Sequence, residues 1–276
     1  MGVTAALLRL HFSATMPLVV PLTVYYARAG KMSGMWLKAW LTALALSLLM
    51  MGAYAINDAV DVEVDRVNLP DRPLPSGRVR CKTAVIVGVA LTSAALGVGA
   101  LVGWPVVGVL SAIALGLLGY NLTSKRLGRL KQVVVAVLVV CMYPLSLVCS
   151  GVPEGRRVDT LFAFPVWMLL TAYGFEVYKD LRDMPGDLQA GRRVMAWHDN
   201  PEKWRRVADG VLGLGAVSLV LPGWLGNTWL YLALVSPAVL IGLWLWRLPL
   251  RAAMAAVYVQ FILVGLAATT DVVVSP

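Results

Sequence analysis

Six aspartates with matched spacing are the side chains in this sequence best placed to do chemistry. They form two groups with the spacing i, i+3 and i+7: Asp58, Asp61 and Asp65, then Asp180, Asp183 and Asp187. Such positions share one face of a helix, so each group should direct three carboxylates the same way. Like charges at this spacing repel each other, and a bound cation would offset the repulsion. Oxygen ligands without nitrogen or sulfur suit a hard ion such as Mg²⁺, which commonly binds carboxylates together with substrate phosphates.

A simpler interpretation is that these aspartates only form ion pairs with basic residues of the same segments. The repeated spacing argues against it, because chance rarely produces the same triplet twice. Twelve of the fifteen acidic residues lie in or beside these two segments, which favours a dedicated acidic site.

The elements that carry these carboxylates are expected to be transmembrane helices. Of 276 residues, 59% are hydrophobic and 14% are charged, which is too little charge to coat a soluble globule of this size. A helix needs about 20 apolar residues to cross a bilayer core of about 30 Å. The sequence therefore predicts an all-α membrane protein with nine spans. These are residues 3–27, 36–56, 83–102, 104–120, 132–151, 160–178, 207–223, 226–246 and 250–272.

Basic residues are distributed unevenly between the two sides that nine spans define. Nineteen lie on one side, including Arg9, and five lie on the other. The positive-inside rule predicts that the richer side is cytoplasmic. That side carries the N-terminus and both aspartate groups. The net charge of +9 is then a consequence of membrane topology, and no nucleic-acid partner is expected.

The two aspartate groups lie four helices apart, which predicts an internal repeat. Two pseudo-symmetric halves would bring both groups over one central cavity at the membrane surface. The whole chain, residues 1–276, is accordingly expected to form a single transmembrane domain around that cavity.

The segments around the aspartates resemble a known family. Residues 57–78 contain N-D-x-x-D-x-x-x-D followed by R-P-x-x-S-G, and residues 174–193 contain K-D-x-x-D-x-x-G-D-x-x-x-G. Both are similar to signatures of the UbiA superfamily of intramembrane prenyltransferases, whose nine-helix fold agrees with the span count. The resemblance implies Mg²⁺-dependent transfer of an isoprenoid chain from a prenyl diphosphate to a lipophilic or aromatic acceptor, with release of pyrophosphate. Membrane lipid would surround the enzyme.

The resemblance also implies roles for individual residues. Breaking the allylic carbon to oxygen bond leaves a carbocation, so the enzyme must stabilise negative charge on the leaving pyrophosphate. The implied metal ligands are Asn57, Asp58, Asp61, Asp65, Asp180, Asp183 and Asp187. The implied catalytic residues are Asp61, Asp183, Lys179 and Tyr120. The residues expected to bind the diphosphate are Arg72, Lys125, Arg126 and Lys179.

Several of these residues have simpler interpretations. Tyr120 could stabilise a carbocation through its ring face, but a tyrosine at a membrane boundary can also be an interfacial anchor. Lys125 and Arg126 could serve only the charge bias of the cytoplasmic side. Arg72 could pair with its neighbour Asp71.

Within the superfamily, the first signature looks most like those of digeranylgeranylglyceryl phosphate synthases and chlorophyll synthases. The second signature favours the former group. Departures occur at Phe175, where that group has arginine, at Val194, where threonine is common, and at Lys131-Gln132, where glycine-asparagine is typical. The resemblance to the first group favours a geranylgeranylglyceryl phosphate-type acceptor, but these departures leave the identity of the acceptor open. An aromatic acceptor, such as 4-hydroxybenzoate or a quinone precursor, stays open, and a membrane transporter is a more remote alternative.

Overall fold

The computed structural model describes residues 3–123, 127–128, 130–151, 153, 155, 157–189 and 200–275, and these contain helices but no strand. The all-α prediction is thus confirmed. The helices are α1 (Val3–Leu7), α2 (Leu10–Thr15), η1 (Met16–Leu18), α3 (Val19–Ala27), α4 (Trp36–Val60), α5 (Val62–Asn68), α6 (Cys81–Val102), α7 (Trp104–Thr123), α8 (Leu130–Val140), α9 (Met142–Ser150), η2 (Asp159–Phe162), α10 (Ala163–Gln189), α11 (Pro201–Ser218), α12 (Leu221–Leu225), α13 (Trp229–Trp244), η3 (Leu245–Arg247) and α14 (Leu250–Val274).

Eight helical segments of the described chain are long and apolar enough to cross a membrane. They correspond to the second through ninth predicted spans. The first predicted span, residues 3–27, instead consists of the short helices α1, α2, η1 and α3. Arg9 between α1 and α2 has a φ of +46°, which ends a right-handed helix, and Pro17 in η1 cannot donate a backbone hydrogen bond. The count of nine is therefore not confirmed.

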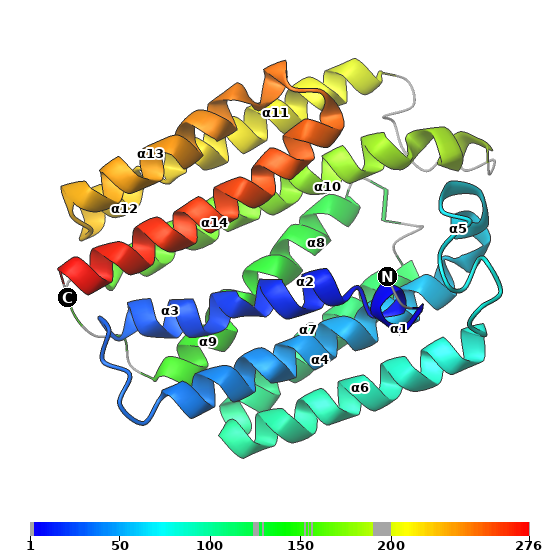
Figure 1. Cartoon of the computed structure of the whole chain (residues 1–276), viewed down its shortest axis with the longest axis horizontal. Helices are drawn as coiled ribbons and strands as arrows, with labels where there is room; N and C mark the ends of the chain where they lie inside the picture. Colours follow the sequence, from blue (N-terminus) through cyan, green and yellow to red (C-terminus); the bar gives the residue numbers. More distant parts are fainter. Residues whose placement is uncertain are drawn as a thin grey trace.

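The long helices lie side by side (Figure 1), and their contacts form a closed ring. α3 contacts α4, which packs on α6 and α7; α7 contacts α8 and α9, and α8 packs on α10. From α10 the contacts pass through α11 and α13 to α14, which returns to α3. Because the ring is closed, the far-apart segments α5 and α10 reach the same end of the bundle. We call this end, on the right in Figure 1, the motif end.

Glycine allows the tightest of these helix contacts. A Cβ atom added to Gly52 of α4 would lie 2.7 Å from the carbonyl oxygen of Gly88 in α6, and one added to Gly88 would lie 2.9 Å from that of Gly52. Both distances are shorter than a carbon to oxygen contact permits. The absence of side chains at this crossing therefore lets α4, which leads to the first aspartate group, pack directly on α6.

The end of the bundle opposite the motif end is held by a buried polar network. Arg157, 2% exposed, donates to the fully buried carboxylate of Asp271 at 2.8 Å and joins the segment before η2 to α14. Asp271 also accepts a hydrogen bond from the backbone N–H of Thr228 at 3.2 Å. Nearby, the Tyr26 hydroxyl lies 2.6 Å from Thr160 Oγ1. These bonds join four segments that are distant in sequence.

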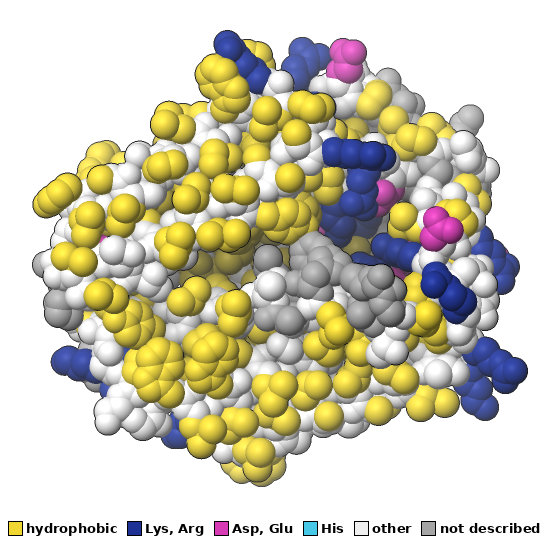
Figure 2. Space-filling model, viewed as in Figure 1, with side chains coloured by type: hydrophobic (Ala, Val, Ile, Leu, Met, Phe, Trp, Pro, Cys, Tyr) yellow, Lys and Arg dark blue, Asp and Glu magenta, His cyan; other side chains and the backbone are white. Residues whose placement is uncertain are grey.

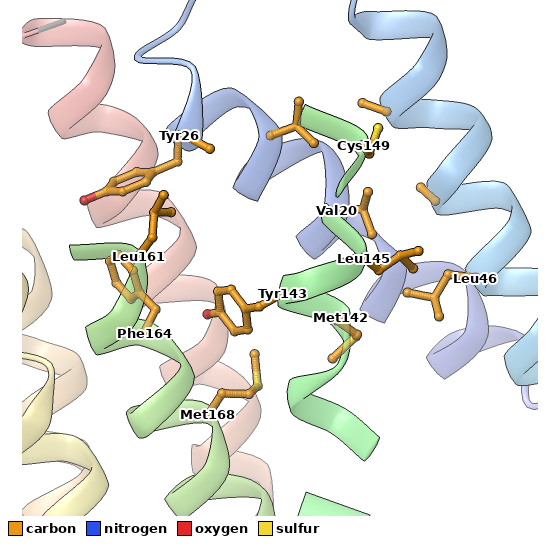
Figure 3. Packing of buried hydrophobic residues seen from close by; sticks show 14 of the residues in the cluster. Val20, Tyr26, Leu46, Met142, Tyr143, Leu145, Cys149, Leu161, Phe164 and Met168 are labelled. Atoms are coloured by element: carbon orange, nitrogen blue, oxygen red, sulfur yellow. The ribbon is translucent and has the colours of Figure 1, made fainter. Parts of the chain in front are cut away.

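Aromatic and aliphatic side chains fill the bundle between this network and the middle of the membrane-spanning region. Tyr26, Leu161 and Phe164 meet in the hydrophobic core, and Tyr143 lies close to Met168 (Figure 3). The rings of Tyr26 and Phe164 make an edge-to-face contact with centroids 5.4 Å apart. Apolar side chains thus fill the bundle between this network and the motif end, where both aspartate groups lie.

Candidate active site

The first aspartate group lies where α4 ends and α5 begins. Asp58 belongs to α4, Asp61 caps both helices with φ of −98° and ψ of 6°, and Asp65 belongs to α5. The prediction of one continuous helical face is therefore wrong for this group, because the backbone leaves helical geometry at Asp61. The second group does lie on one helix, α10, which continues through Asp180 and Asp183 to Gln189.

Two arginines hold the buried carboxylates of the first group. Asp58 Oδ1 lies 2.6 Å from Arg9 Nη2 and 3.5 Å from Arg72 Nη1. Arg72 Nη1 also lies 2.7 Å from Asp65 Oδ2. Arg72, in the loop that follows α5, therefore bridges α4 and α5. Its position is set by Asp58 and Asp65, and not by the neighbouring Asp71 as the simpler interpretation supposed.

Asn57 and Asp61 form the remaining part of this motif. The Asn57 side-chain amide donates to Asp61 Oδ2 at 3.1 Å, which orients the Asp61 carboxylate along the helix junction. Both side chains are partly exposed, unlike those of Asp58 and Asp65. A ligand arriving at the motif end would thus meet Asp61 before the two buried aspartates.

The Asp65 carboxyl group is electrostatically strained by its surroundings. Burial raises the pKa of Asp65 above its ordinary value, and the nearby carboxylates of Asp58 and Asp61 raise the pKa further. The Arg72 guanidinium acts in the opposite direction, but burial is the larger effect. An additional cation near Asp65 would stabilise its ionised form.

In the second group, Asp180 is held by residues from α8. Its Oδ1 atom lies 2.6 Å from Lys131 Nζ. The side-chain amide of Gln132 donates to its other oxygen. Lys131 and Gln132 are among the residues at which the sequence departs from its expected subgroup, and they hold the first aspartate of the second motif.

Asp183 and Lys179 have local partners on α10. Arg182 donates to both carboxylate oxygens of Asp183, at 2.7 and 2.8 Å. Lys179 Nζ lies 2.7 Å from Glu176 Oε1. Asp183, Arg182 and Lys179 are each about one-third exposed, so substrate or solvent could reach these pairs.

The two motifs meet at the same place in the bundle. Helix α5 packs against α10. Tyr120, at the end of α7, lies within electrostatic range of Asp61 from the first motif and of Asp180 and Glu176 from the second. The structure therefore brings together carboxylates that are more than 100 residues apart, as the repeat in the sequence predicted.

The space-filling view agrees with this arrangement. Most of the visible face is hydrophobic, whereas Lys and Arg side chains gather toward the motif end, several of them inside a recess next to acidic side chains (Figure 2). A hydrophobic belt with a charged recess at one end suits a membrane protein whose substrate has a lipid tail and an anionic head.

Some predicted residues cannot be placed at the site. Lys125 and Arg126 lie outside the described residues, and only the backbone of Asp187 is described. Among the described side chains, no group of three acidic, histidine or cysteine residues is close enough to hold one ion. Asp58, Asp65, Asp180 and Asp183 each form an ion pair with a basic side chain.

Three positions at the site had no assigned role from the sequence. Arg9 reaches Asp58 and lies over the ring of Tyr54, 4.5 Å from its centroid. In the sequence, Arg9 is a charged residue within an apolar stretch. We counted it only as one of the basic residues on the predicted cytoplasmic side. Lys131 and Gln132 stood out only as departures from a pattern, and their contacts to Asp180 connect residues 48 and 49 positions apart.

One open groove lies away from this constellation. It has a volume of about 610 Å³ and is lined by residues of α10, α11, η3 and the start of α14, including Arg205, Asp209 and Trp246. None of the five motif aspartates whose side chains the structure describes lines it. Because the carboxylates and their partners converge elsewhere, we place the candidate active site at the junction of α5, α7, α8 and α10.

Comparisons with known proteins bear on this site. Residues 18–266 match the family model of the UbiA prenyltransferase family. A digeranylgeranylglyceryl phosphate synthase of Metallosphaera sedula is 32% identical over 201 residues, which cover 71% of this chain and 69% of that protein.

Two solved structures share the fold. A UbiA homolog from Archaeoglobus fulgidus bound to DMAPP and Mg²⁺ has a TM-score of 0.72 at 15% identity, covering 99% of this chain and 100% of that one. A structure of a digeranylgeranylglyceryl phosphate synthase has a TM-score of 0.74 at 20% identity, covering 98% of each chain. The family resemblance inferred from the two motifs is confirmed.

Proposed function

The chain belongs to the UbiA prenyltransferase family, and we propose that it transfers an isoprenoid chain from a prenyl diphosphate to a lipid acceptor, with Mg²⁺ as cofactor. The observation that carries this proposal is the packing of α5, which follows Asp61 and carries Asp65, against α10, which carries Asp180. Two sets of carboxylates at one end of an apolar bundle suit a substrate with a charged head and a long apolar tail. Family membership argues against the transporter alternative.

The donor atoms at this junction fit Mg²⁺. Carboxylates and an amide oxygen are the ligands that this ion accepts, and the candidate ligands are Asn57, Asp58, Asp61, Asp65, Asp180, Asp183 and Asp187. When bound, Mg²⁺ would polarise the diphosphate as a Lewis acid. Burial and the neighbouring carboxylates of Asp58 and Asp61 disfavour the ionised form of Asp65, which gives a physical reason for a cation at this place.

The protein's own cations would bind and orient the donor. Arg72, which already lies between two motif carboxylates, can move from them to diphosphate oxygens when metal neutralises the carboxylates. Lys179, within electrostatic range of Asp180, would act with Arg72. Preorganised positive charge of this kind stabilises the developing charge on the leaving pyrophosphate. Lys125 and Arg126 remain predicted contributors.

The acceptor we favour is a geranylgeranylglyceryl phosphate-type lipid. Support comes from the relatives, which are named digeranylgeranylglyceryl phosphate synthases. Such an acceptor carries a free hydroxyl group that can attack the allylic carbon. An aromatic acceptor is the alternative, and a direct competition between the two classes would distinguish them.

The motif end is proposed to face the cytoplasm. The reason is the predominance of basic residues among the loops on that side, which include the segment after α4 and the one after α10. Cysteine accessibility in intact cells would test this orientation, since a cysteine replacing the exposed Ser76 should be protected from an impermeant reagent.

The function can be tested with purified protein in lipid nanodiscs. Geranylgeranyl diphosphate, geranylgeranylglyceryl phosphate and Mg²⁺ should give the ether product and pyrophosphate in equal amounts. Asp61→Ala and Asp183→Ala should each abolish both, whereas Glu63→Gln, at an exposed glutamate beside the first motif, should not. Full turnover in both aspartate variants would refute the metal assignment.

A further inference from the structure

Glu176 is a buried carboxylate at the site that belongs to neither aspartate group. It lies in α10, is 7% exposed, and precedes Asp180 by four residues. Residues at this spacing share one helical face, and four residues rise about 6 Å along the axis. Glu176 therefore faces the same junction as Asp180 but lies about one turn deeper, away from the motif end.

Several elements surround this carboxylate. Lys179 of the same helix donates to its Oε1 atom at 2.7 Å. Tyr120 of α7, Lys131 of α8 and Tyr258 of α14 all lie within its electrostatic range, as does Arg182 on its own helix. Polar side chains of α7, α8, α10 and α14 thus lie near this carboxylate.

The depth of Glu176 corresponds to where the transferred carbon must lie. The diphosphate would be held at the level of the aspartates, while the isoprenoid tail extends from it into the apolar part of the bundle. The carbon that joins tail and diphosphate therefore lies slightly deeper than the aspartates. A group one helical turn deeper than Asp180 is at the level of that carbon, and an acceptor hydroxyl must approach there.

We propose that Glu176 is the residue that binds the acceptor hydroxyl group and removes its proton during transfer. This rests on the proposed function, since it requires a hydroxyl acceptor and a prenyl diphosphate donor. The C1–O bond of the donor breaks and its electron pair leaves with pyrophosphate. The hydroxyl oxygen forms a new bond to C1, and its proton passes to the Glu176 carboxylate, from which water removes it.

A purely structural role for Glu176 is the competing explanation. Its pair with Lys179 is an i, i+3 helix pair, and such pairs contribute only about 0.2–0.5 kcal/mol when exposed. Glu63 and Arg66 of α5 form the same kind of pair at 2.9 Å beside the first motif, but Glu63 is exposed. Burying the Glu176 carboxylate costs free energy, and the partly exposed Lys179 offsets that cost only in part, so the ion pair does not explain why a carboxylate is buried here. Glu63 is a matched control because it forms the same kind of pair on an exposed helix face.

The experiment separates donor ionisation from transfer. Geranylgeranyl diphosphate with ¹⁸O at the bridging position is incubated with enzyme and Mg²⁺, and movement of the label to non-bridging oxygens reports reversible ionisation. Transfer to geranylgeranylglyceryl phosphate is measured in parallel. Glu176→Gln should keep ionisation and the donor KM but slow transfer by about 10²–10⁴-fold, the usual contribution of a general base. Glu176→Asp, which keeps a carboxylate, should recover part of the transfer rate, and Glu63→Gln should change neither.

Other outcomes would overturn the proposal. Transfer at the wild-type rate in Glu176→Gln would exclude a role in proton removal. Loss of ionisation and transfer by the same factor, with no recovery in Glu176→Asp, would assign Glu176 to donor binding or to folding. Failure of the wild-type protein in both assays would instead refute the proposed function itself.

Discussion

Replacing Arg157 with methionine should destabilise the protein strongly without changing its chemistry. Arg157 and Asp271 are 2% and 0% exposed, and the guanidinium donates to Asp271 Oδ2 through Nε at 3.0 Å and through Nη2 at 2.8 Å. Removing one partner of such a pair leaves a buried charge without compensation, which costs about 3–5 kcal/mol. For a domain of this size, each kcal/mol shifts the melting temperature by about 2–4 °C, so a decrease of about 6–20 °C is expected.

The assay for Arg157→Met is thermal unfolding in nanodiscs, with prenyl transfer measured well below the transition. Arg66→Met is the control, because the exposed Arg66–Glu63 pair should contribute less than about 1 kcal/mol. Arg157→Met/Asp271→Leu should recover part of the loss, since it removes both charges but leaves the N–H of Thr228 unpaired. Transfer per folded molecule should match the wild type. A melting temperature within about 2 °C of the wild type would refute this reasoning, and a loss of transfer in folded protein would show coupling to the motif end.

Three further predictions concern the site and the helix contact near it. Lys131→Met should remove the ion pair to Asp180 and reduce the rate of prenyl transfer about tenfold or more. Lys131→Arg should reduce that rate less, and steady-state kinetics would measure both variants. Because the pKa of Asp65 is raised, its carboxyl group stays protonated to a higher pH than that of an ordinary aspartate. Protons therefore compete with Mg²⁺ for this carboxylate over a higher pH range. The Mg²⁺ concentration for half-maximal rate should therefore decrease as pH rises, and Asp65→Asn should flatten that dependence in a pH titration. Gly52→Leu should force α4 away from Gly88 and lower the melting temperature, whereas a nearby exposed substitution should not.

Much of the fold follows from the one-dimensional pattern of apolar residues. The segments predicted at 36–56 and 250–272 are helices at Trp36–Val60 and Leu250–Val274, and the separation of the third and fourth spans at Gly103 is real. Gly103 has a φ of +153°, a conformation that few other residues adopt. Helices extend beyond the predicted spans because a helix need not end where the apolar residues end.

Local interruptions were harder to predict than spans. The segment 3–27 is apolar throughout except for Arg9, so length and composition predicted one crossing. The structure divides it at Arg9 and Pro17. Whether a chain bends at such a residue depends on the partners it finds, and Arg9 finds Asp58, which lies 49 residues away.

The sequence by itself determined that this is an all-helical membrane protein of a prenyltransferase family with two acidic motifs. Hydrophobic length and aspartate spacing are properties of short segments, and they can be read without knowing which segments meet. Only the tertiary structure decided that Lys131 holds Asp180, that Arg72 bridges Asp58 and Asp65, and that Glu176 is buried. Ion pairs act over a few ångströms, so their partners are chosen by how the helices close into a ring.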